Sequence, residues 1–494
     1  MTKLPFRRLT THTGGRTLHA FAVTNLCDLC AYFASLRLSE SDLTAKTRSR
    51  RKGRKESYFV NGIHLLDSST TVEQTEQRAR SAGYVELLRL NRDFRLLWTG
   101  QVVSQLGDWF DTIALFTLVQ NLTDSGQVVS LILVARFLPS VVLGPLSGVV
   151  ADRFNRKHIM IASDIARAVV VLGFLTVRKP EQVWVVYVLT VLQLGFSAFF
   201  EPARTAAIPS VVPARDLVTA NSLSSVTWSA MLTLGAAIGG PVTRWFGTDA
   251  AFVIDSLTYV ASALLIAFVA LPRRPPREKK KLTLAKALGV TDTLEGLRYV
   301  RSRPRVVAVL LVKPAWGLGG GILTLLPVFG KKIFPVWGSA ALGMSVLYVA
   351  RGIGTAVGPV LTRRFYSETR QQMQRAIGLA FILAGVFYVA FGTTTSFALA
   401  LLFVCVAHMG GSILWVFSTV LLQTSVEDNF RGRVFAAELM LMTLAMATSN
   451  YLTGEALDRF QLSPRVVVSA IGVFFIIPGL LWFASRRRWD RAGK

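Results

Sequence analysis

Polar side chains recur on one face of the first long apolar segment of the sequence. Gln101, Gln105, Asp108 and Thr112 follow at intervals of four, three and four residues, and Asp111 lies one turn after Asp108. In a helix these positions share a face. At 1.5 Å per residue, Asp108 would lie about 18 Å into a membrane, where a desolvated carboxyl can exchange protons near neutral pH. Gln105, Asp108 and Asp111 are therefore candidates for proton coupling or substrate binding.

The same carboxyls also have a structural interpretation. A charge inside an apolar helix is costly, and it commonly neutralises an opposite charge on a neighbouring helix. Arg136 and Arg167 lie in the second and third apolar segments, so either could form an ion pair with Asp108 or Asp111. The sequence leaves both interpretations open.

Further charges lie within the later apolar segments. Glu201 and Arg204 are three residues apart near the end of the fourth segment, a spacing that favours an ion pair on one helix. For this pair the structural interpretation is the stronger one. Lys313 and Arg351 are isolated cations in the seventh and eighth segments. Each could bind substrate, take part in coupling or form a buried ion pair.

Small residues mark the fifth apolar segment as a helix-packing surface. Gly235, Gly239 and Gly240 provide the small-residue spacing that lets two membrane helices approach closely, and Pro241 bends the chain. Close and smooth contact is what two halves need if they rock against each other. Tight packing without motion would use the same residues.

The composition indicates which elements must position these residues. Of 494 residues, 52% are hydrophobic and 17% are charged, with a mean hydropathy of +0.45, which argues against an ordinary soluble enzyme. Twelve apolar segments can each cross a hydrocarbon layer of about 30 Å, and each must be helical because a bilayer offers no water to other backbone conformations. They cover residues 96–119, 128–150, 158–177, 183–203, 218–243, 250–271, 306–329, 338–361, 375–394, 397–421, 434–455 and 466–485.

The longest internal connection divides these segments into two sets of six. We expect a polar, basic and disordered extension over residues 1–85, six-helix bundles over 86–271 and 306–494, and a basic linker over 272–305. The second bundle ends in a basic tail. The predicted fold class is an all-α integral membrane protein with twelve transmembrane helices in two pseudo-symmetric bundles.

Lys and Arg are distributed unequally between the connections on the two sides. Connections on the side of the N-terminus, together with the C-terminal tail, hold 27 of these residues, and those on the opposite side hold 7. Because positive residues concentrate on the cytoplasmic side, we expect both termini in the cytoplasm and a multi-pass protein in the cell (inner) membrane. The net charge of +26 then reflects topology and not nucleic-acid binding.

The sequence lacks residues that other functions need. No phosphate-binding loop of the form GxxxxGK[ST] occurs, so direct use of ATP is not indicated. Of five histidines only His408 lies in a predicted span, and Cys27 and Cys30 form a lone CxxC. These residues do not suggest an enzyme or metal site, and we expect neither a cofactor nor a metal.

The connection between the second and third segments resembles a known loop signature. It reads Gly148-Val-Val-Ala-Asp152-Arg153-Phe-Asn155-Arg156-Lys157, similar to the G-x-x-x-D-[RK]-x-G-[RK]-[RK] motif of the major facilitator superfamily. The resemblance implies a helix contact at Gly148 and a helix-end anion at Asp152. It also implies that Arg153, Arg156 and Lys157 are partners in a cytoplasmic gate. Asn155 replaces a glycine, a mild change because Asn tolerates the left-handed conformation.

Other segments are similar to the drug-antiporter branch of that superfamily, which includes macrolide efflux proteins and the enterobactin exporter. They are Leu106–Trp109, Ala135–Pro139, Gly144–Gly148, Phe200–Arg204, Ala220–Leu223 and Phe252–Asp255. The end of the run from Gly235 to Pro241 is similar to the antiporter motif, which implies export. Thr362 stands where a second copy of the loop signature would have its acid, and the fourth segment lacks the usual arginine near residues 191–195.

The residues and the resemblance together predict a secondary transporter and not an enzyme. It would export a hydrophobic or amphipathic small molecule, such as a drug, macrolide or siderophore, by alternating access and proton antiport. Its partners would be the substrate, the lipid bilayer and protons, without nucleic acid, and it would act as a monomer. The alternatives are a lipid or lysolipid flippase of the same fold and, less favoured, a membrane-embedded enzyme.

Overall fold

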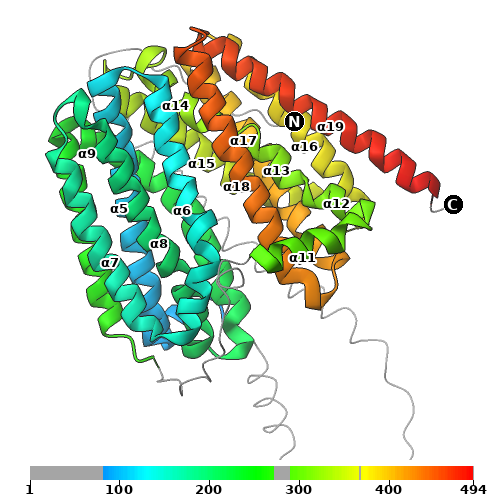
Figure 1. The fold of residues 1–494 in the computed structure, drawn as a ribbon, viewed down its shortest axis with the longest axis horizontal. Coiled ribbons are helices and arrows are strands. Elements are labelled where there is room, and N and C mark those ends of the chain that lie inside the picture. Colours follow the sequence, from blue (N-terminus) through cyan, green and yellow to red (C-terminus); the bar gives the residue numbers. More distant parts are fainter. Residues whose placement is uncertain (1–81, 272–289, 366–368, 493–494) are drawn as a thin grey trace, which may run out of the picture. The chain divides into compact units, whose positions relative to one another are not determined.

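The computed structural model describes residues 82–271, 290–365 and 369–492. Residues 77–494 belong to one compact unit, whose described part is built from helices (Figure 1). The extension expected over residues 1–85 lies outside the described residues as far as residue 81, and so does the expected linker from 272 to 289. The remainder of that linker is largely helical, since residues 290–301 form a helix.

The first bundle forms from the blue-to-green half of the chain (Figure 1). Its helices are α4 (Tyr84–Leu90), α5 (Arg92–Thr123), α6 (Gly126–Arg153), α7 (Arg156–Gly173), α8 (Val183–Val211) and α9 (Leu217–Ala267). The long α9 contains two predicted spans. It turns at Gly247, whose φ of +86° and ψ of 169° are not helical. Glycine reaches this conformation at little cost because it has no Cβ.

The second bundle forms from the green-to-red half of the chain. Its helices are α11 (Val290–Arg301), α12 (Pro304–Leu310), α13 (Val312–Gly317), α14 (Ile322–Lys332), α15 (Ala340–Phe365), α16 (Arg370–Thr393), α17 (Phe397–Ser425), α18 (Asp428–Asp458) and α19 (Pro464–Ala492). The predicted seventh span is thus divided into α12, α13 and α14. The second break falls at Gly319, Gly320 and Gly321, where a Cβ on Gly319 would lie 1.9 Å from the Phe475 ring.

The helices agree with twelve membrane crossings. Within the described residues, ten helical segments are long and apolar enough to span a membrane, and the segment containing α9 covers two predicted spans. The remaining predicted span, residues 434–455, lies in α18, which is 31 residues long but is not among these ten apolar segments. Length and composition therefore give the all-α membrane fold expected from the sequence.

Side-chain caps fix where several helices begin. The Asn91 side chain accepts a hydrogen bond from the backbone N–H of Phe94 (2.9 Å) at the start of α5, and Ser125 accepts one from Val128 at the start of α6. Asn155 accepts one from the N–H of Lys157 (3.0 Å). Its φ of −66° is extended and not left-handed, so the reason expected for Asn at this position is wrong: Asn155 caps α7.

The two bundles meet through α9 with α15 and through α6 with α18. At the first contact, a Cβ on Gly240 would lie 2.3 Å from Cβ of Ser345, and the Ser345 hydroxyl donates to the carbonyl of Ala236. Gly235 and Gly239 instead face α5, where a Cβ would lie 2.7 Å from Trp109 and 3.2 Å from its carbonyl. The small residues of α9 thus allow close packing on two sides.

Replacing Gly240 by Ala should destabilise this contact, since the added methyl group overlaps Ser345 and the neighbouring backbone. We expect a loss of about 1–3 kcal/mol, measured as a lower unfolding temperature of the purified protein in detergent. Gly144→Ala is the matched control, because a Cβ at Gly144 meets no atom within 4 Å. Equal unfolding temperatures for the two variants would contradict the packing assigned to Gly240.

Candidate functional site

A cavity of about 780 Å³ lies between the two bundles. Helices α5 to α9 of the first bundle and α14 and α15 of the second form its wall. The wall contains the following residues selected from the sequence: Gln105, Asp108, Arg136, Arg167, Glu201, Arg204 and Arg351. Asp111 and Lys313 are buried outside the wall.

The cavity runs toward one end of the helices. Ile208, near the end of α8, and Asn221, near the start of α9, belong to the wall. At the other limit, Phe116 is the wall residue of α5 closest to the helix end at Thr123. The cavity therefore extends toward the side on which α6 ends and α7 begins.

Asp108 contributes a carboxyl to the cavity wall. It accepts a hydrogen bond from the hydroxyl of Tyr259, which is fully buried on α9. The guanidinium of Arg167 lies 4.3 Å from the centre of the Tyr259 ring and 4.7 Å from that of Phe200. Tyr259 could not be singled out from the sequence, because a single tyrosine in an apolar segment is an ordinary membrane residue.

Asp111 lies next to Arg136 and is fully buried. One of its oxygens is 3.8 Å from Nη1 of Arg136 and accepts a hydrogen bond from the Gln193 amide (3.3 Å), which also contacts the Tyr259 hydroxyl (3.3 Å). Arg136 also donates to the hydroxyl of Thr112 at 3.2 Å. Asp108 and Asp111 therefore belong to one polar network that joins α5, α6, α8 and α9.

Helix α7 adds a buried ion pair to this network. Arg167 donates to Asp164 one turn before it on α7, and both are buried. Asp255 on α9 is also fully buried: a Cβ on Gly107 would lie 2.3 Å from its Oδ1, and its Oδ2 lacks a hydrogen-bond partner. From the sequence, Asp255 stood out only as the end of a family-like segment, because its approach to α5 depends on the tertiary fold.

The network contains more carboxyls than cations. Its acids are Asp108, Asp111, Asp164 and Asp255, and its bases are Arg136 and Arg167. In the described part of the chain, no group of three or more His, Cys, Asp or Glu side chains could hold a metal ion. The arrangement can therefore exchange protons or bind a charged group, but the described residues provide no metal centre.

Glu201 and Arg204 form the ion pair that their spacing suggests. Nη2 of Arg204 lies 2.9 Å from Oε2 of Glu201, and its Nη1 donates to the side-chain oxygen of Gln101 on α5 at 2.8 Å. Arg204 is buried and Glu201 is exposed. The bond from Arg204 to Gln101 thus connects α8 to α5 at the cavity wall.

The two isolated cations of the second bundle have different surroundings. Lys313 donates to Glu438 on α18 at 2.8 Å, and both side chains are buried away from the cavity wall. Arg351 faces the cavity from α15, with its guanidinium 5.6 Å from the centre of the Tyr348 ring. Its Nε is buried without a hydrogen-bond partner.

The gate-like loop makes contacts within the first bundle. Arg156 donates to the carbonyls of Ala151 (3.3 Å) and Ala206, and Lys157 donates to that of Val269 at 2.9 Å. These contacts satisfy carbonyls at helix ends. Arg153 is exposed.

The helix contact expected at Gly148 is not formed in this conformation. A Cβ added there would meet no atom within 4 Å. The physical reason is that α6 touches α18 near the opposite end of α6, where a Cβ on Gly454 would lie 2.2 Å from the hydroxyl of Ser130. The side chain of Asp152 lies outside the described residues.

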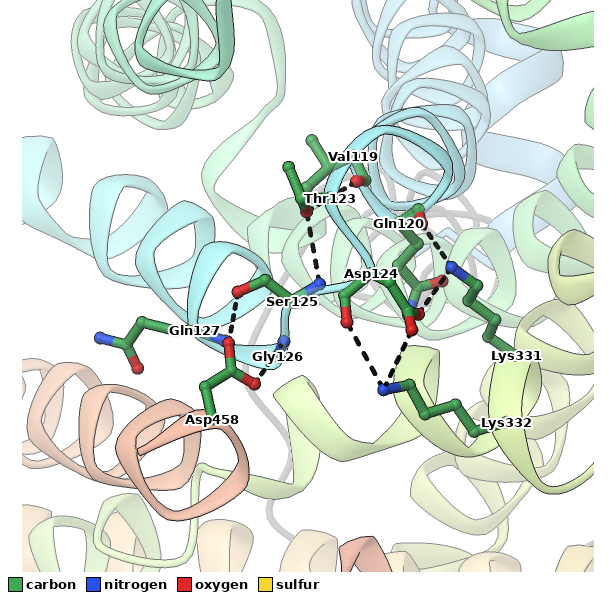
Figure 2. Close-up of polar contacts among 10 residues, drawn as sticks. All are labelled: Val119, Gln120, Thr123, Asp124, Ser125, Gly126, Gln127, Lys331, Lys332 and Asp458. Atoms are coloured by element: carbon green, nitrogen blue, oxygen red, sulfur yellow. Dashed lines mark hydrogen bonds and ion pairs between the residues drawn. The ribbon is translucent and has the colours of Figure 1, made fainter. Parts of the chain in front are cut away.

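Charged side chains join the two bundles at the end opposite the cavity opening (Figure 2). Asp124, which ends α5, lies 2.8 Å from Nζ of Lys331 and 3.5 Å from Nζ of Lys332 at the end of α14. The hydrogen bond from Lys331 and the two positive charges hold the pKa of Asp124 below its usual range. Because Asp124 is exposed, each pair contributes less than about 1 kcal/mol.

A second cross-bundle contact lies beside the first (Figure 2). Asp458, at the end of α18, accepts hydrogen bonds from the Ser125 hydroxyl and from the backbone N–H groups of Gly126 and Gln127, both at 3.0 Å. A carboxylate at a helix N-terminus is stabilised by free N–H groups and by the helix dipole. Asp458 therefore caps α6 from the other bundle.

Proteins of known sequence include several relatives of this chain. The chain is 30% identical over 410 residues to the uncharacterised MFS-type transporter YfiS of Bacillus subtilis, an alignment that covers 81% of this chain and 95% of YfiS. It is 25% identical over 385 residues to macrolide efflux protein A of Streptococcus pyogenes, covering 76% of this chain and 92% of that protein.

Solved structures share the fold. The nucleoside transporter NupG superposes with a TM-score of 0.59 at 14% identity, covering 80% of this chain and 99% of that chain. A bacterial homologue of the human lysosomal transporter Spinster superposes with a TM-score of 0.61 at 16% identity, covering 80% and 97%. The predicted fold class and the prediction of a transporter in place of an enzyme are confirmed. A sequence profile matches residues 97–449, and the chain belongs to the Major Facilitator Superfamily.

Proposed function

We propose that the protein exports an amphipathic small molecule from the cytoplasm by alternating access, coupled to proton entry. The observation that carries this proposal is a cavity between two bundles whose wall contains Asp108, a carboxyl connected to a buried polar network. Aromatic side chains beside these groups, including Trp109 and Trp228, suit a substrate with an apolar body. Macrolide efflux by a relative supports export as the direction.

Alternating access requires one end of the cavity to close when the other opens. Here the bundles are joined by Asp124 and Asp458 at one end, and the cavity extends toward the other. The excess of Lys and Arg on the latter side favours its assignment to the cytoplasm. In the proposed cycle this is the inward-facing state, with both chain termini cytoplasmic and the monomer as the transporting unit.

Proton coupling follows from the excess of carboxyls over guanidiniums in the network. Arg136 pairs with Asp111 and Arg167 with Asp164, so Asp108 and Asp255 are left without an ion-pair partner of their own. Two further negative charges in a medium of low dielectric constant are unfavourable. Holding a proton removes one of these charges. Because Asp108 is the member of this pair that lies in the cavity wall, it is the residue that we assign to proton exchange.

The coupling assignment predicts that Asp108→Asn reduces proton-driven accumulation to the level of protein-free vesicles. The measurement is uptake of a radiolabelled macrolide into proteoliposomes under an imposed pH gradient. Asp111→Asn should, in addition, lower the unfolding free energy, because it leaves the half-buried Arg136 guanidinium without the acid beside it. Asp249→Asn, in an exposed pair with Arg178, is the control.

Unchanged transport in Asp108→Asn would show that the coupling assignment is wrong. A parallel assay follows labelled lysophospholipid in the same vesicles. Movement of the lipid without movement of the macrolide would replace the export proposal with a flippase.

The cross-bundle contacts predict that Asp458→Asn favours the outward-open state. The experiment places spin labels at Asn121→Cys and Phe460→Cys, in a protein without its native cysteines, and measures their separation in detergent. We expect a longer distance in the variant, because a neutral amide caps α6 less strongly. Arg459→Gln, which removes an ion pair with Glu455 within α18, should leave the distance unchanged. Equal distances in wild type and Asp458→Asn would contradict the role of this cap.

The lowered pKa of Asp124 predicts that its contact does not respond to pH in the neutral range, which the same label pair can test. The folded-state pKa lies below the ordinary value of 3.8, so the contact's contribution is complete above that value and is lost only as the pH falls through the lowered one. The wild-type distance should therefore stay constant from pH 8 to pH 5. A lengthening within this window that Asp124→Asn abolishes would contradict the assignment.

A further inference from the structure

We propose that Arg351 binds the carboxylate of the transported molecule, which makes the substrate class amphipathic acids. This inference rests on the proposed transport function and specifies its substrate. It concerns the one selected cation in the cavity wall that lies on the second bundle.

Arg351 differs from the other selected cations in its partners. Arg136, Arg167, Arg204 and Lys313 each have an acid within 4.0 Å, namely Asp111, Asp164, Glu201 and Glu438. Among the described residues, Arg351 has no ion-pair partner, and its Nε makes no hydrogen bond. The protein thus provides a counter-charge for these four cations but not for Arg351, which reaches the cavity from α15.

The groups that surround Arg351 do not neutralise it. Its electrostatic neighbours are the phenols of Tyr348 and Tyr388 and the imidazole of His408. A phenol with an ordinary pKa near 10 is uncharged at neutral pH, and an imidazole is neutral or positive. A guanidinium in such surroundings is costly unless water or an anion reaches it.

During the transport cycle, the free-energy cost of an unpaired Arg351 guanidinium would depend on whether substrate is bound. While the cavity is open to water, solvent can satisfy the free donors of Arg351. Closing the cavity removes that water, and a carboxylate on the substrate can then replace it. The planar fork of a guanidinium suits a carboxylate because two parallel N–H groups can face its two oxygens. Closure would therefore be favoured when an acid is bound.

The wall near Arg351 also suits the apolar part of such a substrate. The Trp109 and Tyr348 rings come from different bundles, and their centres lie 5.6 Å apart. Tyr348 is the ring closest to Arg351 along α15, at 5.6 Å from its guanidinium. An aromatic or aliphatic body placed against these rings would bring an attached carboxylate to Arg351.

Binding of two matched probes tests the proposal. Dansylglycine carries a carboxylate, and dansylglycinamide has the same aromatic body without the charge. Each is titrated into the purified full-length protein in detergent, and dansyl emission is excited through tryptophan, since Trp109 and Trp228 line the cavity. We expect the acid to bind at least about tenfold more tightly than the amide, the gain from one charge-assisted hydrogen bond.

Variants assign that preference to a residue. Arg351→Gln should bind the two probes equally, and Arg351→Lys should keep part of the preference because it keeps the charge but not the fork. Arg178→Gln removes an exposed arginine paired with Asp249 and should keep the full preference. Unfolding temperatures of all variants show whether each one is folded.

The proposal is overturned if the wild-type protein binds the amide as tightly as the acid or binds neither probe at 1 mM. It is also overturned if folded Arg351→Gln keeps the preference. Binding is measured without a pH gradient or transport, so the result is independent of the proposed coupling. If the protein exports a macrolide but does not prefer the acidic probe, the proposed function stands and this inference is rejected. If it prefers the acidic probe but exports nothing, this inference stands and the proposed function is rejected.

Discussion

Charges inside the membrane need partners within the protein, and this constraint organises the first bundle. The Asp111–Arg136 and Asp164–Arg167 pairs connect or stabilise α5, α6 and α7, while Gln193 and Tyr259 add hydrogen bonds from α8 and α9. The same network places Asp108 at the cavity wall. In the proposed function, the carboxyl that exchanges protons belongs to this same structural network.

The contact between the two bundles is polar at one end and formed by small residues in the middle. At the end opposite the cavity opening, Asp458 provides a carboxylate to the free N–H groups of α6, and Asp124 lies beside two lysines. Between the bundles, Gly240 provides a smooth contact with α15. Exposed polar contacts exchange readily with water, whereas glycine contacts allow sliding without unsatisfied groups. In the proposed transport cycle, the polar contacts at this end would separate while the glycine contact stays packed.

Much of the fold could be predicted, but parts of the site could not. The twelve apolar segments correspond to the helices because hydropathy and backbone satisfaction are local properties. The division of the seventh span, the cap made by Asn155 and the open space at Gly148 depend on neighbouring helices and on the conformational state. Tyr259 and Asp255 could not be recognised for the same reason, since the role of each depends on its contact with α5.

The sequence by itself determined the membrane class, the two sets of six helices, the family and the set of side chains able to carry charge. The spacing of Glu201 and Arg204 predicted their ion pair, but only the tertiary structure decided which charges of different helices are paired. It placed Arg136 beside Asp111, gave Lys313 its partner Glu438 on α18, and left Arg351 facing the cavity. The physical reason is range: hydropathy acts through each segment's own contact with lipid, whereas an ion pair requires two atoms from distant segments to lie within a few ångströms.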